Sequence, residues 1–230
     1  MAEALPIDMT GVARRQLHVL LALDCSGSMQ GDRIASLNYA IRTALPELCQ
    51  VAADNPEVDV RLRVLRFASR AEWHVAEATP VDTVRWSDLS AGGETHMGDA
   101  LRLLAEALEP AAMPGRQLPP VVLLASDGLP TDDVEAGLTA FFAATNAASA
   151  VRLAIAIGSD ADQAVLESFI RHPSMKPMRA NNATDLVQHI RWATSAPVKA
   201  VSSPGTAADP LIPLARSADL SSPPVSDILW

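Results

Sequence analysis

Three almost entirely apolar runs recur along the chain, at residues 19–23, 121–125 and 151–157. A strand that helices cover on both faces has this pattern, because neither of its faces needs polar side chains. The length of each run suits a strand better than a helix. The three runs therefore predict the central strands of a buried, parallel sheet.

Between and after these runs, apolar residues recur at intervals of three and four, which is typical of helices with one buried face. The residues expected on these inner faces are Ile34, Leu37, Ile41, Leu45 and Leu48, then Met97, Leu101, Leu104 and Leu108, then Val134, Leu138, Phe141 and Phe142, and finally Leu186, Val187, Ile190 and Ala193. A shorter helix is expected at 165–170. Pro46 falls inside the first pattern and predicts a kink or a new start there, because proline lacks a backbone donor.

The order of these elements predicts the fold class. Residues 58–67 alternate between apolar and charged, and 72–78 follow after a four-residue turn, which indicates a hairpin near one sheet edge. A further short strand is expected at 177–180. Strands and helices otherwise alternate, which favours right-handed crossovers between parallel strands. We expect an α/β fold with a Rossmann-like, doubly wound, mostly parallel sheet, helices on both faces and one antiparallel edge strand.

Composition divides the chain into three parts, with a lead-in at 1–15, one domain at 16–195 and a tail at 196–230. The tail contains six prolines and seven serines or threonines without helical periodicity, which is typical of a linker. Apolar clusters at 211–214 and 228–230 interrupt it. We interpret these two clusters as short docking motifs.

Charge and hydrophobicity exclude several classes of partner. The formal charge of −9 opposes the counterion release that drives proteins onto nucleic acid. The N-terminus has no apolar segment of signal-peptide type, and no run approaches the ~20 apolar residues of a membrane span. We therefore expect a cytoplasmic protein that binds neither nucleic acid nor membrane. The two cysteines, Cys25 and Cys49, are expected to be free thiols.

The polar turn after the first apolar run is the first candidate site. Asp24 ends the run, and Ser26 and Ser28 follow at alternate positions with a glycine between them. Open α/β sheets bind ligands just beyond the carboxyl ends of their strands, so these oxygen atoms lie where a site is expected. A helix cap is the alternative, but it explains one such side chain and not three.

Two later stretches carry further oxygen side chains. Thr95 follows the pair Gly92 and Gly93 just before a predicted helix, where it could also be an ordinary cap. Asp127 stands after the second apolar run, so it brings a second carboxylate to a strand end. His96 lacks a second histidine or cysteine at ligand spacing nearby, and we leave it out of the site.

Taken together, these stretches resemble the von Willebrand factor A domain family over residues 16–194. Asp24, Ser26 and Ser28 match the family's D-x-S-x-S element, Thr95 its threonine and Asp127 its second aspartate, so every position of the metal-ion-dependent adhesion site is filled. Within the family, the segments DCSGSM, SAGGETHMGDAL and ASDGLPTDD look most like the bacterial, tellurite-resistance-associated TerY type.

The chemistry of the five side chains agrees with this resemblance. Carboxylate and hydroxyl oxygens suit a hard cation, for which Mg²⁺ is the first choice and Mn²⁺ or Ca²⁺ the alternatives. The resemblance implies that an Asp or Glu of a protein partner completes the coordination. The TerY type further implies an associated protein kinase and a PP2C-type phosphatase.

An enzyme is the competing hypothesis. Phosphatases and phosphotransferases of the haloacid-dehalogenase type also place an Asp at the end of the first strand and bind Mg²⁺. They usually carry a second Asp two residues later as acid and base, where this chain has Ser26, which cannot readily do that work at neutral pH. A serine hydrolase is weaker still, since neither Ser26 nor Ser126 lies in a G-x-S-x-G motif. The sequence therefore favours a binding module without catalysis.

Overall fold

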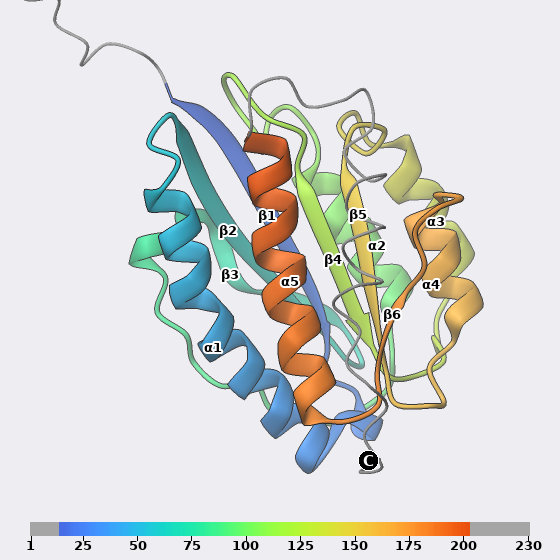
Figure 1. The fold of residues 1–230 in the computed structure, drawn as a ribbon. Helices are drawn as coiled ribbons and strands as arrows, with labels where there is room; N and C mark the ends of the chain where they lie inside the picture. The colour runs from blue at the N-terminus through green and yellow to red at the C-terminus, as the bar shows by residue number, and fades with distance from the viewer. Residues whose placement is uncertain (1–13, 203–230) are drawn as a thin grey trace, which may run out of the picture.

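A six-stranded sheet in the order β3-β2-β1-β4-β5-β6 forms the centre of the computed structural model, which describes residues 14–202 (Figure 1). The strands are β1 (Arg15–Asp24), β2 (Val58–Phe67), β3 (Ala71–Pro80), β4 (Val121–Ser126), β5 (Val151–Ile157) and β6 (Met178–Ala180). The helices are α1 (Asp32–Ala53), α2 (Met97–Ala107), α3 (Val134–Ala143), α4 (Gln163–Ile170) and α5 (Ala183–Ser202), with short 3₁₀ turns η2 (Gly27–Met29) and η3 (Val81–Thr83). Every strand and helix expected from the apolar pattern is present.

The sheet confirms the predicted fold class. All neighbouring strands run parallel except β2 and β3, which form the antiparallel pair at one edge. The central strands β4 and β5 are buried at every position, because helices cover both faces of the sheet. β2 instead alternates between buried and half-buried residues over most of its length, and β3 has no buried residue, as expected for strands near an edge.

The helices form two layers (Figure 1). α1 and α5 lie side by side over one face of the sheet, and α2 and α3 cover the other. Of the kink or new start predicted at Pro46, the new start was wrong, because α1 continues through it to Ala53. Pro46 and Arg42 are both exposed, so water reaches the carbonyl of Arg42, which loses its partner to the proline. The burial of Ile41 before the proline and Leu48 after it stabilises the helix on both sides of Pro46.

The C-terminal helix α5 extends beyond the expected domain end at residue 195. It continues to Ser202 and includes Pro197, and Val198 is fully buried. Burial of that side chain explains why the helix persists in a segment whose composition resembles a linker. The apolar clusters at 211–214 and 228–230, like the lead-in at 1–13, lie outside the described residues.

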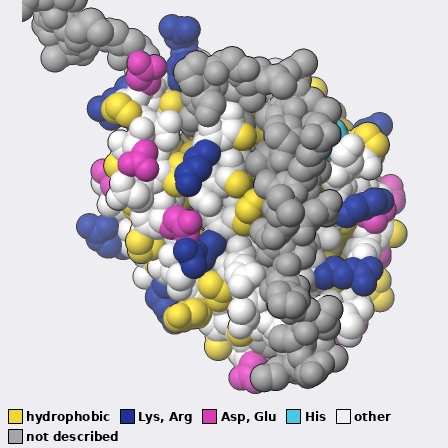
Figure 2. Space-filling view, viewed as in Figure 1, with side chains coloured by type: hydrophobic (Ala, Val, Ile, Leu, Met, Phe, Trp, Pro, Cys, Tyr) yellow, Lys and Arg dark blue, Asp and Glu magenta, His cyan; other side chains and the backbone are white. Residues whose placement is uncertain are grey.

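The surface over α1 and α5 mixes charges of both signs. Figure 2 shows basic and acidic side chains next to one another on this face, with hydrophobic ones scattered between them. Among residues 14–202, no helix combines the length and the apolar character that crossing a bilayer requires.

The central strand β1 also buries a titratable side chain, His18, which is 2% exposed. Burial, followed by the charges of Arg61 and Arg63, lowers the pKa of His18 from 6.5 to about 4. The unfolded chain therefore takes up a proton first as the pH falls, and the free energy of unfolding should decrease by about 2 kcal/mol between pH 7 and pH 5.

We expect His18→Gln to remove this part of the pH dependence. Urea unfolding of both proteins at pH 7 and pH 5 would measure it. If the free energy of unfolding fell by the same amount between pH 7 and pH 5 in both proteins, His18 would not contribute to this pH dependence.

Candidate metal centre

The candidate site lies beyond the carboxyl ends of β1 and β4, at the lower end of the sheet in Figure 1. Asp24 is the last residue of β1 and is fully buried. Its Oδ1 accepts the backbone N–H of Ser26 at 2.8 Å, and its Oδ2 accepts the hydroxyl of Ser126 at 2.5 Å. Burial raises the pKa of the Asp24 carboxyl, and the charge of Asp127 adds to this effect, while the bonds from Ser126 and Ser26 oppose it. A bound cation would stabilise the charged carboxylate.

The two serines of the turn place their hydroxyls together. Ser26 precedes the 3₁₀ turn η2, which contains Ser28, and the Oγ atoms of the two serines are 3.0 Å apart. The Ser28 hydroxyl also donates to Oδ1 of Asp127 at 2.7 Å. One network of hydrogen bonds therefore connects the turn after β1 to the carboxylate that follows β4.

The Gly92-Gly93 loop lies directly against this turn. Gly27 donates its N–H to the carbonyl of Gly93 at 2.9 Å, and Gly92 donates to the carbonyl of Cys25 at 2.8 Å. Gly93 has φ +91°, and a Cβ there would lie 2.4 Å from the Oγ of Ser69. Glycine at position 93 thus allows this loop to pack closely against Ser69.

This loop carries Thr95 into the same region. Thr95 is 5% exposed, and its backbone is held by two bonds to Thr131, one from its own N–H to Oγ1 at 3.0 Å and one to its carbonyl at 2.9 Å. A Cβ built on Gly128 would lie 3.5 Å from Ser28 Oγ and 3.6 Å from Thr95 Oγ1, so both hydroxyls face this glycine. The capping role considered for Thr95 was wrong, because the N-cap residue of α2 is His96, which makes no side-chain capping bond.

Asp132 fulfils that capping role, which the sequence did not suggest. Its two carboxylate oxygens accept the N–H groups of Gly98 and Asp99, both at 2.9 Å. Asp133 alone caps α3, by accepting the N–H of Ala136 at 3.0 Å. Asp132 therefore fixes the start of α2, next to Thr95.

Asp127 is shared between the turn and a positive charge. Its side chain is fully buried, and its Oδ2 accepts a hydrogen bond from Nη1 of Arg33 at 2.5 Å. Arg33 belongs to the first turn of α1, and its Nη2 lies 3.2 Å from Oδ1 of Asp160. Sequence reasoning missed Arg33, because 94 residues separate it from Asp127 and no local pattern connects them.

These contacts fit a hard cation. The hydroxyls of Ser28 and Ser126 donate their hydrogens to the two carboxylates, so the Ser28 oxygen accepts from Ser26 and keeps one lone pair for another partner. Hydroxyls oriented by buried carboxylates form the two shells that metal sites in proteins usually have. With oxygen donors alone, the set suits Mg²⁺, Mn²⁺ or Ca²⁺ better than a metal that prefers sulfur or nitrogen.

A second group of ionisable side chains lies nearby, at the start of α2. One ligand atom from each of His96, Asp99 and Asp132 lies within 4.8 Å of the others. A hydrogen bond to Glu94 raises the pKa of His96, Asp99 pairs with Arg102 at 2.8 Å, and Asp132 binds two amides. Helix capping and ion pairing account for this group without a metal.

The nucleophiles near the site lack activating partners. The partners of the Ser26 and Ser126 hydroxyls are Ser28 and Asp24, respectively, and not a histidine. Cys25 is a buried free thiol, and burial together with the charge of Asp24 raises its pKa to about 12. Neither arrangement resembles an activated nucleophile.

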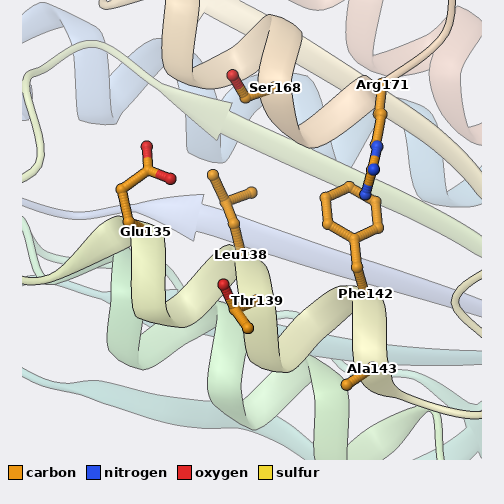
Figure 3. A pocket seen from close by; sticks show the side chains of 7 residues that line it. All are labelled: Glu135, Leu138, Thr139, Phe142, Ala143, Ser168 and Arg171. Carbon is orange, nitrogen blue, oxygen red and sulfur yellow. The ribbon is translucent and has the colours of Figure 1, made fainter.

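An open groove of about 560 Å³ lies elsewhere, between α3 and α4 (Figure 3). Its lining residues are Glu135, Leu138, Thr139, Phe142, Ala143, Ser168 and Arg171. The Arg171 guanidinium lies 4.7 Å from the centre of the Phe142 ring, and this pair closes one end of the groove in Figure 3. The groove shares no residue with the candidate site, which consists of Asp24, Ser26, Ser28, Thr95 and Asp127.

Comparisons with known proteins agree with the fold. The sequence model of the von Willebrand factor type A domain matches residues 18–191. A comparison by sequence with curated proteins gave no match.

Several solved structures share the fold. A von Willebrand factor type A protein from Catenulispora acidiphila is 17% identical with a TM-score of 0.60, over 81% of this chain and 43% of that one. The ArnB paralog VWA2 from Sulfolobus acidocaldarius is 16% identical with a TM-score of 0.57, over 78% and 45%. Proximal thread matrix protein 1 from the mussel byssus, with a zinc-occupied MIDAS motif, is 15% identical with a TM-score of 0.55, over 79% and 48%. The chain spans less than half the length of these three structures.

Proposed function

We propose that this chain, which belongs to the von Willebrand factor type A domain family, binds a protein partner through a divalent cation. The cation would be held beyond the carboxyl ends of β1 and β4. Domains of this family are generally metal-dependent protein–protein interaction modules, and the mussel relative carries zinc in its motif. In our proposal Mg²⁺ is the resident ion, with Mn²⁺ or Ca²⁺ as alternatives. The residues that would hold it are Asp24, Ser26, Ser28, Thr95 and Asp127.

The hydrogen bond from Ser28 to Asp127 is the observation that carries this proposal. It joins two segments 99 residues apart, and it commits the one hydroxyl hydrogen of Ser28, so the Ser28 oxygen can only accept on the side that faces Ser26. Ser26 and Ser28 would then bind the ion directly, while the carboxylates orient the hydroxyls and supply negative charge. The ion would keep a free position, which a carboxylate of the partner's Asp or Glu would fill.

The identity of the partner is the finer part of the proposal. The segments DCSGSM, SAGGETHMGDAL and ASDGLPTDD support a cytoplasmic role of the tellurite-resistance-associated type, with a protein kinase and a PP2C-type phosphatase as partners. Capture of the two purified enzymes on the immobilised chain, with Mg²⁺ or with a chelator, would test this. Equal retention of both enzymes under the two conditions would contradict metal-dependent binding.

We also propose that the chain has no hydrolytic activity. Domains of this family are typically interaction modules, and the residue two positions after Asp24 is Ser26, whose hydroxyl bonds to Ser28 rather than to a base. Phosphate esters, nucleotides and acyl esters incubated with the Mg²⁺-loaded protein should show no turnover above the uncatalysed rate. Metal-dependent turnover that Asp24→Asn abolishes would instead favour the phosphatase of haloacid-dehalogenase type.

A further inference from the structure

We propose that Arg33 sets the preference of the metal centre for an anionic ligand, by neutralising Asp127 and leaving positive charge on the cation. This inference rests on the proposed function and names the residue that tunes it. Arg33 would neither bind the metal nor touch the partner. It would act as a positioning residue through Asp127.

The two carboxylate oxygens of Asp127 have different partners. One faces the candidate metal centre, and the other faces Arg33. Oδ1 accepts the hydroxyl of Ser28 at 2.7 Å, and Oδ2 accepts Nη1 of Arg33 at 2.5 Å. Since the Asp127 side chain is fully buried, water does not compete for either oxygen. The charge of this carboxylate is thus shared between the side that faces Ser28 and a fixed guanidinium on the other side.

The structure provides a fitted position for the guanidinium. Gly158 follows β5 with φ +81°, and a Cβ there would lie 2.8 Å from Nη2 of Arg33. The N–H of Gly158 donates to the carbonyl of Ala180 at 2.8 Å, which holds this turn against β6. Asp160 contacts the outer side of the guanidinium at 3.2 Å. Arg33 is therefore held by the ends of β4 and β5 rather than extended into solvent, and its side chain is 17% exposed.

The position of the Arg33 guanidinium matters because it changes the net charge of the site. A divalent cation near Asp24 and Asp127 has its charge balanced by the two carboxylates, which would weaken its attraction for a third. The Arg33 guanidinium adds one positive charge to this group. Asp160 offsets little of it, because its side chain is 62% exposed and screened by water and salt. The site then keeps a net positive charge and favours an anion in the open position.

This role predicts effects of opposite sign on metal and ligand. Arg33→Met should increase the affinity for Mn²⁺ about tenfold, because Asp127 regains its full charge, and should decrease the affinity of the Mn²⁺-loaded protein for acetate about tenfold. Calorimetry would measure Mn²⁺ binding, and water-proton relaxation of the Mn²⁺-loaded protein would follow acetate. Arg33→Lys keeps the charge and should restore both affinities.

Arg42 on the same helix provides a matched control. It pairs with Asp88 at the surface, where the two side chains are 46% and 57% exposed, and Arg42→Met should change neither affinity. Asp160→Asn is a second variant that keeps Arg33 and Asp127 in place. It removes a negative charge, so it should decrease Mn²⁺ affinity and increase acetate affinity, each about twofold. This variant tests the inference even if Arg33→Met does not fold.

Parallel losses of Mn²⁺ and acetate binding in Arg33→Met would overturn the inference, since they would mean that Arg33 only holds Asp127 in place. Two unchanged affinities in Arg33→Met would overturn it equally. A wild-type protein that binds no Mn²⁺, or binds Mn²⁺ without acetate, would instead contradict the proposed function, and the inference would fall with it. The wild-type titrations thus separate the two failures.

Discussion

Asp24→Ala should reduce the affinity for Mn²⁺ about 100-fold, which would be the largest effect of any single substitution at the site. The variant removes a negative charge next to the ion. It also removes the acceptor for the N–H of Ser26 and for the hydroxyl of Ser126, which together fix the turn after β1. Calorimetric titration of the metal-free variant and wild type with Mn²⁺ would measure the loss, and urea unfolding with a chelator would confirm that the variant folds.

Asp133→Ala provides the matched control for this experiment. Asp133 accepts a backbone N–H as Asp24 does, but it does so at the start of α3, outside the site. Its loss should cost about 1 kcal/mol of stability and leave Mn²⁺ affinity unchanged. Equal Mn²⁺ binding by folded Asp24→Ala and wild type would show that the ion, if it binds at all, binds elsewhere.

The fold could be predicted from the sequence because its signals are local. A covered central strand such as 121–125 is an apolar run, and each helix shows its buried face within two or three turns. The positions of the candidate residues in the fold could be predicted for the same reason. Asp24 and Asp127 end or follow apolar strands, and Thr95 follows a pair of glycines. The structure brings Ser26, Ser28 and the two carboxylates into one hydrogen-bonded network.

The contacts that sequence reasoning missed join segments far apart in the chain. Asp132 lies just before α3 in the sequence, but its carboxylate accepts the amides of Gly98 and Asp99, more than 30 residues away. Arg33 looked like an ordinary surface residue of α1, since nothing near it indicates a carboxylate. Such contacts depend on how the loops at the strand ends pack against one another. The spacing of apolar residues within one element contains no information about that packing.

The helix α5 is longer than its sequence pattern indicated, for a different reason. Prolines and serines after residue 195 resemble a linker, yet α5 continues through Pro197 to Ser202. The deciding residue is Val198, which is fully buried, so packing outweighs local propensity over this last stretch.

Gly137→Ala should decrease the free energy of unfolding by about 3 kcal/mol, through the contact between α2 and α3. A Cβ at this position would lie 2.6 Å from Cα of Gly98 and 2.7 Å from its carbonyl oxygen, both backbone atoms that cannot rotate away. Alanine is otherwise favoured in a helix by about 1 kcal/mol over glycine, so the substitution tests which effect is larger. We expect the clash to prevail, because Asp132 fixes the start of α2 and prevents it from moving aside.

Thr139→Ala, on the exposed side of the same helix, isolates the effect of helix propensity. Thr139 points toward solvent at the groove between α3 and α4, so its replacement should raise stability slightly or leave it unchanged. Urea unfolding of the two variants and the wild type would compare them. If Gly137→Ala were as stable as Thr139→Ala, α2 and α3 would have room to separate. The close packing that fixes the start of α2, and with it Thr95, would then be looser than the structure indicates.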